Sequence, residues 1–145
     1  MRVLVETETI LATYTTKKAP LITGAFLSTV KDTILGKKYD LSISFVGKEK
    51  MREINRTSRG IDKATDILSF PIELGKTGAG EIYICTDKVI SKSADFESTP
   101  KKYLEYLFVH GMVHLLGHDH GTKMDSLEKK YTKKLHILYP YRYTE

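Results

Sequence analysis

The sequence is poor in the features that mark secreted and membrane proteins. Cys85 is the only cysteine among 145 residues, so no internal disulfide can form, and a reduced, cytoplasmic setting fits this composition. No apolar run approaches the length of a membrane span, and the chain does not open with an apolar segment followed by a small-residue cleavage site. We therefore expect a cytoplasmic protein without a signal peptide and without a membrane partner.

The composition is that of an ordinary globular domain with a modest basic excess. Hydrophobic residues make up 41% and charged residues 28% of a chain long enough to bury a real core. The net charge of +5 comes from 23 basic against 18 acidic side chains, which favours a polyanionic partner without establishing one. Cys85 lies in an apolar run, and we expect it to be a small core residue.

Hydrophobic periodicity predicts short strands, concentrated in the first two thirds of the chain, and several helices. We expect strands over about 2–10, 41–46, 65–71 and 81–85, and helices over about 20–35, 47–57, 87–94, 100–116 and 122–139. This mixture predicts a single α+β domain over residues 1–145, with one small mixed sheet and helices packed on it. The order of strands in the sheet does not follow from the sequence.

The helix expected over 100–116 carries the most specific spacing in the chain. His110 and His114 are four residues apart, which places both imidazoles on one helix face. Gly117 can adopt the positive φ that ends a helix, and His120 can then return to the same point. Three imidazoles and a fourth position open to water form a catalytic zinc site, so the pattern predicts a zincin-like set of His110, His114 and His120.

The remaining polar residues around this pattern have alternative interpretations. His118 could replace a ligand, but a tetrahedral site with an open position needs only three protein ligands. Asp119 could fix the tautomer of a neighbouring imidazole, or it could cap the turn. His136 stands apart from the cluster, and we expect it to be structural or solvated.

Gly111 stands where the zinc-protease motif H-E-x-x-H has its glutamate. Glycine carries no base, so the spacing of a three-histidine metalloprotease is present without the group that activates water for peptide cleavage. The pattern therefore argues against a peptidase.

The stretch 110–120, HGMVHLLGHDH, resembles the signature H-G-x-L-H-L-x-G-Y-D-H of the YbeY-type rRNA maturation factors. The segments 55–59 and 64–71 resemble the arginine loop and the T-D-V-L-S-F-P block of that family, and residues 80–82 stand where it commonly has G-D-I. The resemblance covers about residues 41–121. The departures are small and touch none of the expected ligands: a tyrosine, a leucine and an aspartate of the family are replaced by His118, Val113 and Glu81.

This resemblance implies a metal-dependent endoribonuclease that prefers single-stranded RNA, with zinc as the expected metal. Members of the family act in ribosomal RNA maturation, chiefly at the 3′ end of the small-subunit RNA, and in ribosome quality control. Carried over by position, His110, His114 and His120 would hold one Zn²⁺ per chain, and the arginine that acts in RNA cleavage would be Arg59. Ribosomal RNA and the small ribosomal subunit are thus the expected partners.

The chemistry of these residue types agrees with that expectation. Three neutral imidazoles leave the ion its full charge, which attracts a phosphodiester and lowers the pKa of bound water toward about 7. Arg59 would offer two parallel donors to phosphate oxygens, and its alternative role is that of a solvated loop cation. Arg56 and Lys63, in the same expected loop, are candidate phosphate-steering neighbours.

Two alternatives to the nuclease remain open. One is another metal-dependent hydrolase, a peptidase included, and the other is a non-catalytic ribosome assembly factor whose metal is structural. The identity of the metal is also open, because three imidazoles accept nickel, cobalt or copper as well as zinc.

The last expected helix carries four lysines largely outside its apolar stripe: Lys129, Lys130, Lys133 and Lys134. Such a run is typical of a solvated helix face, and we expect it to face water rather than to form an RNA groove.

Overall fold

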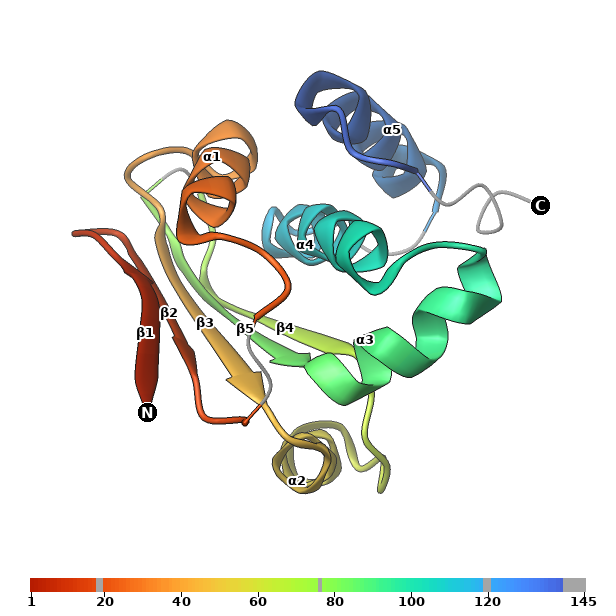
Figure 1. Ribbon diagram of the computed structural model, residues 1–145. Helices are drawn as coiled ribbons and strands as arrows, with labels where there is room; N and C mark the ends of the chain where they lie inside the picture. The colour runs from red at the N-terminus through yellow and green to blue at the C-terminus, as the bar shows by residue number, and fades with distance from the viewer. Residues whose placement is uncertain (18–19, 76, 119–120, 140–145) are drawn as a thin grey trace.

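Five strands form one mixed sheet (Figure 1). The computed structural model describes residues 1–17, 20–75, 77–118 and 121–139. The strands are β1 (Arg2–Glu6), β2 (Ile10–Tyr14), β3 (Asp40–Val46), β4 (Ile67–Glu73) and β5 (Ala79–Cys85). They lie in the order β1-β2-β3-β5-β4, with β2, β3 and β5 parallel and the two outer strands antiparallel to their neighbours.

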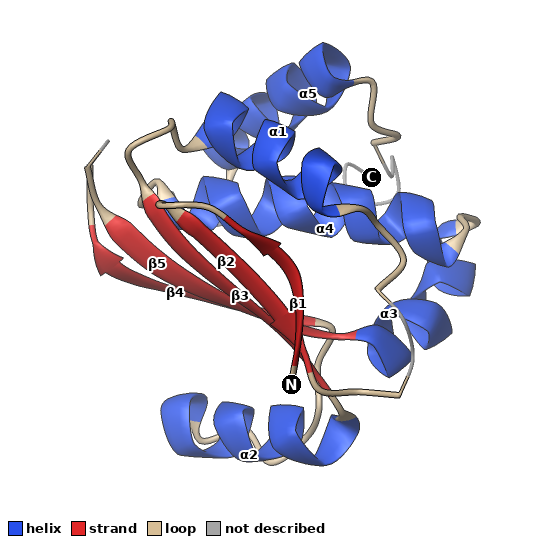
Figure 2. Ribbon diagram, turned by 60° about the vertical axis from the view of Figure 1, so that its left-hand side comes forward, coloured by secondary structure: helices blue, strands red, loops and turns tan. Residues whose placement is uncertain are grey.

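Helices cover both faces of this sheet (Figures 1 and 2). On one side lie α1 (Gly24–Ile34), α3 (Thr86–Ser93), a short 3₁₀ turn (Ala94–Phe96) and α4 (Pro100–Leu115). On the other side lies α2 (Lys48–Arg59), and α5 (Thr122–Leu135) packs on α4 as an outer layer. The predicted α+β class is confirmed.

The two central strands supply the floor of the main core. Alternation along β3 turns Leu41, Ile43 and Phe45 toward α1 and α4, and Ile82 and Ile84 of the neighbouring β5 extend the same apolar surface. All five side chains are at most 1% exposed.

A second, smaller apolar cluster lies under α2, where Met51 meets Val46, Leu68 and Cys85. Cys85 is fully buried, as predicted, and burial raises the pKa of its thiol. The thiol therefore acts as a core side chain.

The N-terminal segment forms two strands rather than the single strand predicted over 2–10. The Thr7 hydroxyl accepts hydrogen bonds from the backbone N–H groups of Thr9 (3.3 Å) and Ile10 (3.2 Å), which turns the chain after β1. This local side-chain bond competes with the extended conformation. The chain then returns antiparallel as β2, a strand that the sequence pattern did not reveal.

Three predicted element ends are also wrong. The first helix begins at Gly24 rather than near residue 20, because the Thr23 hydroxyl accepts the Phe26 N–H (3.1 Å) and caps it. β4 continues two residues beyond Pro71, which an edge strand tolerates. The last helix ends at Leu135, followed by His136 in the left-handed conformation (φ 56°), and Pro140 lies outside the described residues.

The predicted histidine-bearing helix forms as α4, one residue shorter than predicted. The Thr99 hydroxyl caps its first turn by accepting the Lys102 N–H (3.2 Å), and Gly117 at φ 95° follows its end. Gly111 lets α4 lie close to the sheet, since a Cβ there would stand 2.8 Å from both Ile67 Cδ1 and Ser69 Oγ.

We predict that a bulky residue at position 111 lowers stability through this close approach. Gly111→Leu should reduce the free energy of unfolding by about 1–3 kcal/mol because it overpacks the contact with β4. The measurement is urea denaturation followed by circular dichroism. The control is Ala25→Leu, which adds nearly the same volume at an exposed position of α1. It should change the free energy of unfolding by less than about 0.5 kcal/mol. Equal effects of the two substitutions would contradict a tight contact at Gly111.

Candidate functional site

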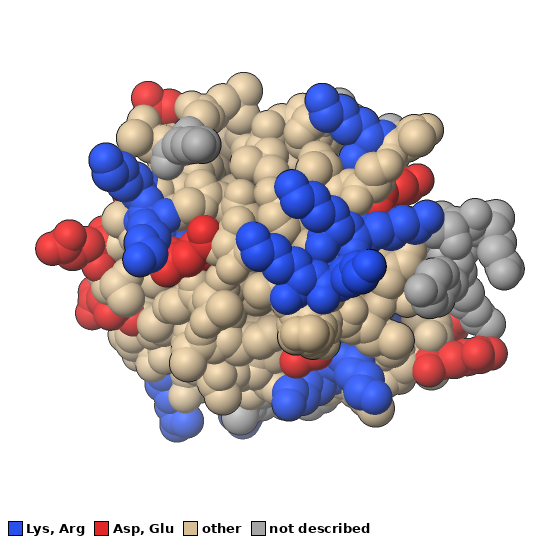
Figure 3. Space-filling view, turned by 90° about the horizontal axis from the view of Figure 1, so that it is seen from above, with Lys and Arg blue, Asp and Glu red and all other residues tan. Residues whose placement is uncertain are grey.

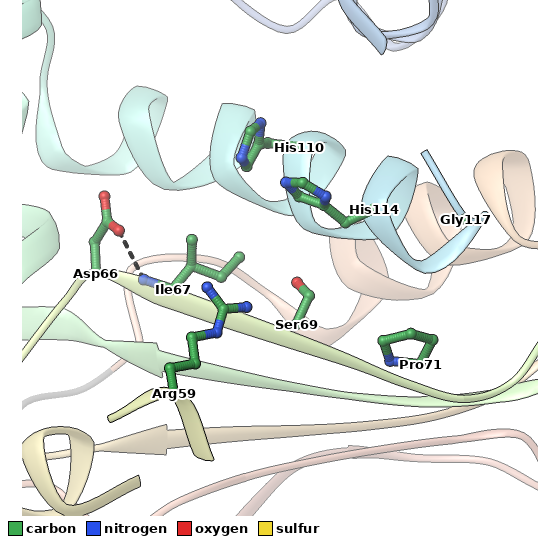
Figure 4. Close-up of a pocket in the computed structure, with 8 residues that line it drawn as sticks. All are labelled: Arg59, Asp66, Ile67, Ser69, Pro71, His110, His114 and Gly117. Atoms are coloured by element: carbon green, nitrogen blue, oxygen red, sulfur yellow. Dashed lines mark hydrogen bonds between the residues drawn. The ribbon is translucent and has the colours of Figure 1, made fainter. Parts of the chain in front are cut away.

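A cleft of about 600 Å³ opens between α4 and β4 (Figure 4). Three elements contribute the side chains that matter most for its chemistry. α4 provides His110 and His114, and the end of α2 provides Arg59. β4 forms the floor with Ile67, Ser69 and Pro71.

The two histidines lie side by side on one face of α4, as their spacing predicts. Their ring centroids are 4.7 Å apart and the ring planes are nearly perpendicular, at 89°. His110 Nδ1 lies 2.8 Å from Glu128 Oε2, and His114 Nδ1 lies 3.0 Å from the backbone carbonyl oxygen of His118. Each ring is therefore oriented through Nδ1.

These two contacts decide the tautomer of each neutral ring. A carbonyl oxygen and a carboxylate oxygen only accept hydrogen bonds, so Nδ1 carries the proton in both His110 and His114. The lone pair of each ring is then on Nε2, the atom that would bind a metal. A metal-binding histidine that donates its other N–H to a carboxylate or carbonyl is the usual arrangement in metalloproteins.

The predicted ligand set is only partly within the described residues. His110 and His114 fit a metal site by position and tautomer, whereas His120, the predicted third ligand, and Asp119 lie outside them. Within the described ranges, no group of three His, Cys, Asp or Glu side chains could hold a metal ion. The role of the three histidines as ligands stays a prediction.

Glu128 is a site residue that the sequence analysis missed. Its side chain is 3% exposed, and its carboxylate accepts the Tyr106 hydroxyl (2.6 Å) as well as the His110 ring. The available signal was its spacing, because Glu128 stands four residues after Met124 and four before Thr132, and all three are buried. An acid in the buried stripe of a helix requires a partner.

His118 acts on the site through its backbone. Its carbonyl oxygen accepts the His114 Nδ1–H, so the residue that follows the turn at Leu116 and Gly117 orients the second ring. This is a different contribution from the substitute ligand considered above. His136 is exposed, as expected.

Arg59 is the last residue of α2, so the prediction that it lies in a loop is wrong. The helix runs up to Gly60, which takes φ 71° and donates its N–H to Arg56 O (3.0 Å). The following loop is fastened by Asn55 Nδ2, which donates to Lys63 O (2.9 Å). The Arg59 guanidinium lies 5.8 Å from the centroid of the Phe70 ring, and Figure 4 shows the side chain pointing toward the histidines.

The structure does not bring the two candidate neighbours of Arg59 to the cleft. Arg56 faces a separate groove that it shares with Glu49 and Glu53, and Lys63 is exposed and does not line the cleft. Arg59 is therefore the basic residue that lines the cleft in the described part of the chain.

Asp66, directly before β4, fixes the rim of the cleft. One carboxylate oxygen accepts the Ile67 N–H (2.8 Å), and the other accepts the Tyr103 hydroxyl (2.7 Å) and lies 3.7 Å from Lys92 Nζ. These contacts tie β4 to α4 and α3. The Asp66 carboxylate thus has structural partners, although it lines the cleft.

Comparison with known proteins identifies the family. A family profile described as Endoribonuclease YbeY matches residues 5–138. The Endoribonuclease YbeY of Clostridioides difficile is 34% identical over 108 residues, which cover 69% of this chain and 70% of the relative. That of Sulfurimonas denitrificans is 42% identical over 102 residues, which cover 70% of each chain.

A solved structure agrees with these matches. The solution structure of TM1509 from Thermotoga maritima superposes with a TM-score of 0.62 at 28% identity and covers 88% of this chain and 89% of that one. The chain belongs to the YbeY endoribonuclease family, as the resemblance of its motifs indicated. Family membership supports an endoribonuclease role, and endoribonucleases are hydrolases.

None of the helices in the described ranges combines the length and the apolar character that crossing a lipid bilayer requires.

We predict that the Glu128 carboxylate strengthens metal binding by His110. Glu128→Gln should weaken Zn²⁺ affinity by about 10- to 100-fold, the usual effect of losing such a supporting contact. The affinity is measured by competition with a chromogenic chelator. Tyr106→Phe leaves the Glu128–His110 contact in place and should have a smaller effect. Unchanged affinity in the Glu128 variant would show that this carboxylate does not support a metal ligand.

Proposed function

We propose that this protein is a metal-dependent, single-strand-preferring endoribonuclease whose metal is Zn²⁺. The observation that carries the proposal is the pair of oriented rings, His110 and His114, facing the same cleft as Arg59. His120, next in the motif, is the third ligand in this proposal. Family membership supports the nuclease activity.

The ion would supply Lewis-acid chemistry, attracting the phosphodiester and lowering the pKa of a water molecule. The chain provides the rest of the site. Glu128 and the His118 carbonyl hold the two rings in the tautomer that presents Nε2. Both groups belong to the protein itself, so the two rings are already oriented before any ligand binds.

Arg59 binds and orients the phosphodiester in this proposal. A guanidinium offers two parallel donors to non-bridging oxygens and remains charged at any working pH. The position of Arg59 at the C-terminal end of α2 suits a cation, because the helix dipole is negative there. The Phe70 ring beneath it limits the directions in which the guanidinium can point.

The proposed substrate is ribosomal RNA, chiefly the 3′ end of the small-subunit RNA, and the proposed setting is ribosome maturation and quality control in the cytoplasm. The motif resemblance supports this choice, and the net charge of +5 agrees with a polyanionic partner. An unpaired RNA end also fits an open cleft better than a duplex does, because its phosphodiester is free to bend into the site.

Peptide hydrolysis receives no support from the site. Gly111 lacks the base of the protease motif, and a Cβ there would stand 2.8 Å from Ile67 and Ser69 on the cleft floor, so a larger side chain would have to displace them. A glutamate at this position would be directed against β4.

We predict that the histidines and Arg59 belong to one nuclease site. Wild-type protein should cut a small-subunit ribosomal RNA fragment with an unpaired 3′ extension, and His114→Ala should abolish this cleavage. Arg59→Glu should slow it by at least about 10²-fold, because a donor to developing charge is lost. The measurement is single-turnover cleavage followed on denaturing gels.

Arg56→Glu is the matched control, because it makes the same charge change one turn earlier on α2, away from the cleft. It should retain most of the wild-type rate. If all variants cut alike, the activity is a contaminant. If wild type binds one equivalent of metal and cuts nothing, and chelation unfolds the domain, a structural metal in a non-catalytic factor becomes the better explanation.

A further inference from the structure

The outward face of α5 carries charge that the proposed function does not use. Five exposed lysines, here called the lysine face, lie along this helix: Lys123, Lys129, Lys130, Lys133 and Lys134. Figure 3, which views the molecule from the α5 side, shows Lys and Arg side chains gathered over this part of the surface. The lysines are exposed, as the sequence pattern predicted. The same prediction held that they form no RNA groove, and the proposal below departs from it.

The charges of α5 are sorted between its two sides. Its acids turn inward, where Asp125 and Glu128 line a small cavity next to His110. None of the ion pairs between described residues involves the lysine face, whereas on α2 Arg52 pairs with Asp62 at 2.8 Å. Lysines four apart repel each other and weaken a helix. An external anion would remove this repulsion.

A groove of about 460 Å³ adjoins the lysine face. Lys129 and Lys133 form one side, and Ile137, Leu138 and Tyr139, which follow α5, supply apolar surface. Leu138 is 49% exposed, whereas Ile137 and Tyr139 are only 6% and 7% exposed, so the accessible apolar surface of the groove is chiefly that of Leu138. Lys129 Nζ lies 5.9 Å from the centroid of the Tyr139 ring. Cations beside apolar side chains suit single-stranded nucleic acid, since phosphates meet the cations and unpaired bases cover the apolar surface.

We propose that the lysine face and this groove bind a second stretch of the RNA strand whose phosphodiester occupies the cleft. The inference rests on the proposed function, because it takes RNA as the substrate. The two sites share α5, since Glu128, which holds His110, directly precedes Lys129 in the helix. An acidic protein segment would satisfy the lysines, but it would leave the exposed apolar surface of the groove without the flat bases that cover it.

The test compares RNA binding by two variants of equal charge. The first replaces Lys129, Lys130, Lys133 and Lys134 by glutamine. The control replaces Lys37, Lys38, Lys48 and Lys50, which are exposed and lie outside α5, by glutamine. Both are made in the full-length His114→Ala protein to prevent cleavage, with folding checked by circular dichroism. Fluorescence anisotropy then measures the affinity for a long oligouridylate over a series of salt concentrations.

The lysine-face variant should lose at least about tenfold in affinity. The slope of log affinity against log salt should fall by about 3, since four phosphate contacts each contribute about 0.7 for a single strand. Leu138→Ser should weaken binding with the slope unchanged, because it removes an apolar contact and no charge. With His114 intact, cleavage of a short oligonucleotide that occupies only the cleft should be unaffected by the four lysine changes.

Two results would overturn the proposal. One is an affinity and slope in the lysine-face variant that match those of the control. The other is polyglutamate that binds wild type more tightly than the RNA does and loses this binding in the lysine-face variant, since the occupant would then be an acidic protein segment. If the lysine-face variant loses RNA binding but wild type cuts no RNA, the lysine face binds RNA and the proposed nuclease activity is wrong. If wild type cuts RNA but the variant binds RNA as well as the control does, the nuclease activity stands and the proposed role of the lysine face is wrong.

Discussion

One buried carboxylate connects the packing of the helices to the geometry of the site. Glu128 reaches from α5 to two residues of α4, Tyr106 and His110, so the contact that docks the outer helix also orients the first histidine. A buried acid without partners costs several kcal/mol, and here both oxygens have donors. The second ring is held independently, because His114 donates to the carbonyl of His118 in the turn after α4. Two different segments therefore orient the two rings.

The charged side chains around His110 are distributed unevenly between two cavities. The cleft that His110 lines contains Arg59 and Asp66, and a smaller cavity of about 230 Å³ that also borders His110 contains Lys92 together with Asp66, Asp125 and Glu128. The charges of the cleft balance, whereas carboxylates are in excess in the smaller cavity. The side chains lining the two cavities therefore favour an anion on the Arg59 side of the ring.

Local rules predicted much of the histidine helix, and contacts between distant segments account for what they missed. The shared face of His110 and His114 and the positive φ of Gly117 each depend on a few consecutive residues. Glu128 lies 18 positions from His110, and only the packing of α5 on α4 brings the two together.

The position of Arg59 could not be predicted for a similar reason. The end of α2 depends on a loop that returns to it, where Arg52 pairs with Asp62 at 2.8 Å and Asn55 binds the Lys63 carbonyl. These contacts cannot be seen in the sequence, where a polar stretch of this kind predicts a loop. The order of the strands likewise depends on pairing between segments that are far apart in the sequence.

The proline in β4 has a consequence for what the cleft can accept. β4 is an outer strand of the sheet, and Pro71 lines the cleft at a point where the strand register shifts. An extended polypeptide binds to such an edge by adding a strand through backbone hydrogen bonds. Proline offers no N–H, and the irregular register disrupts the spacing that a new strand would need. The edge beside the cleft is therefore a poor template for a peptide, and it also resists pairing with the sheet of another molecule.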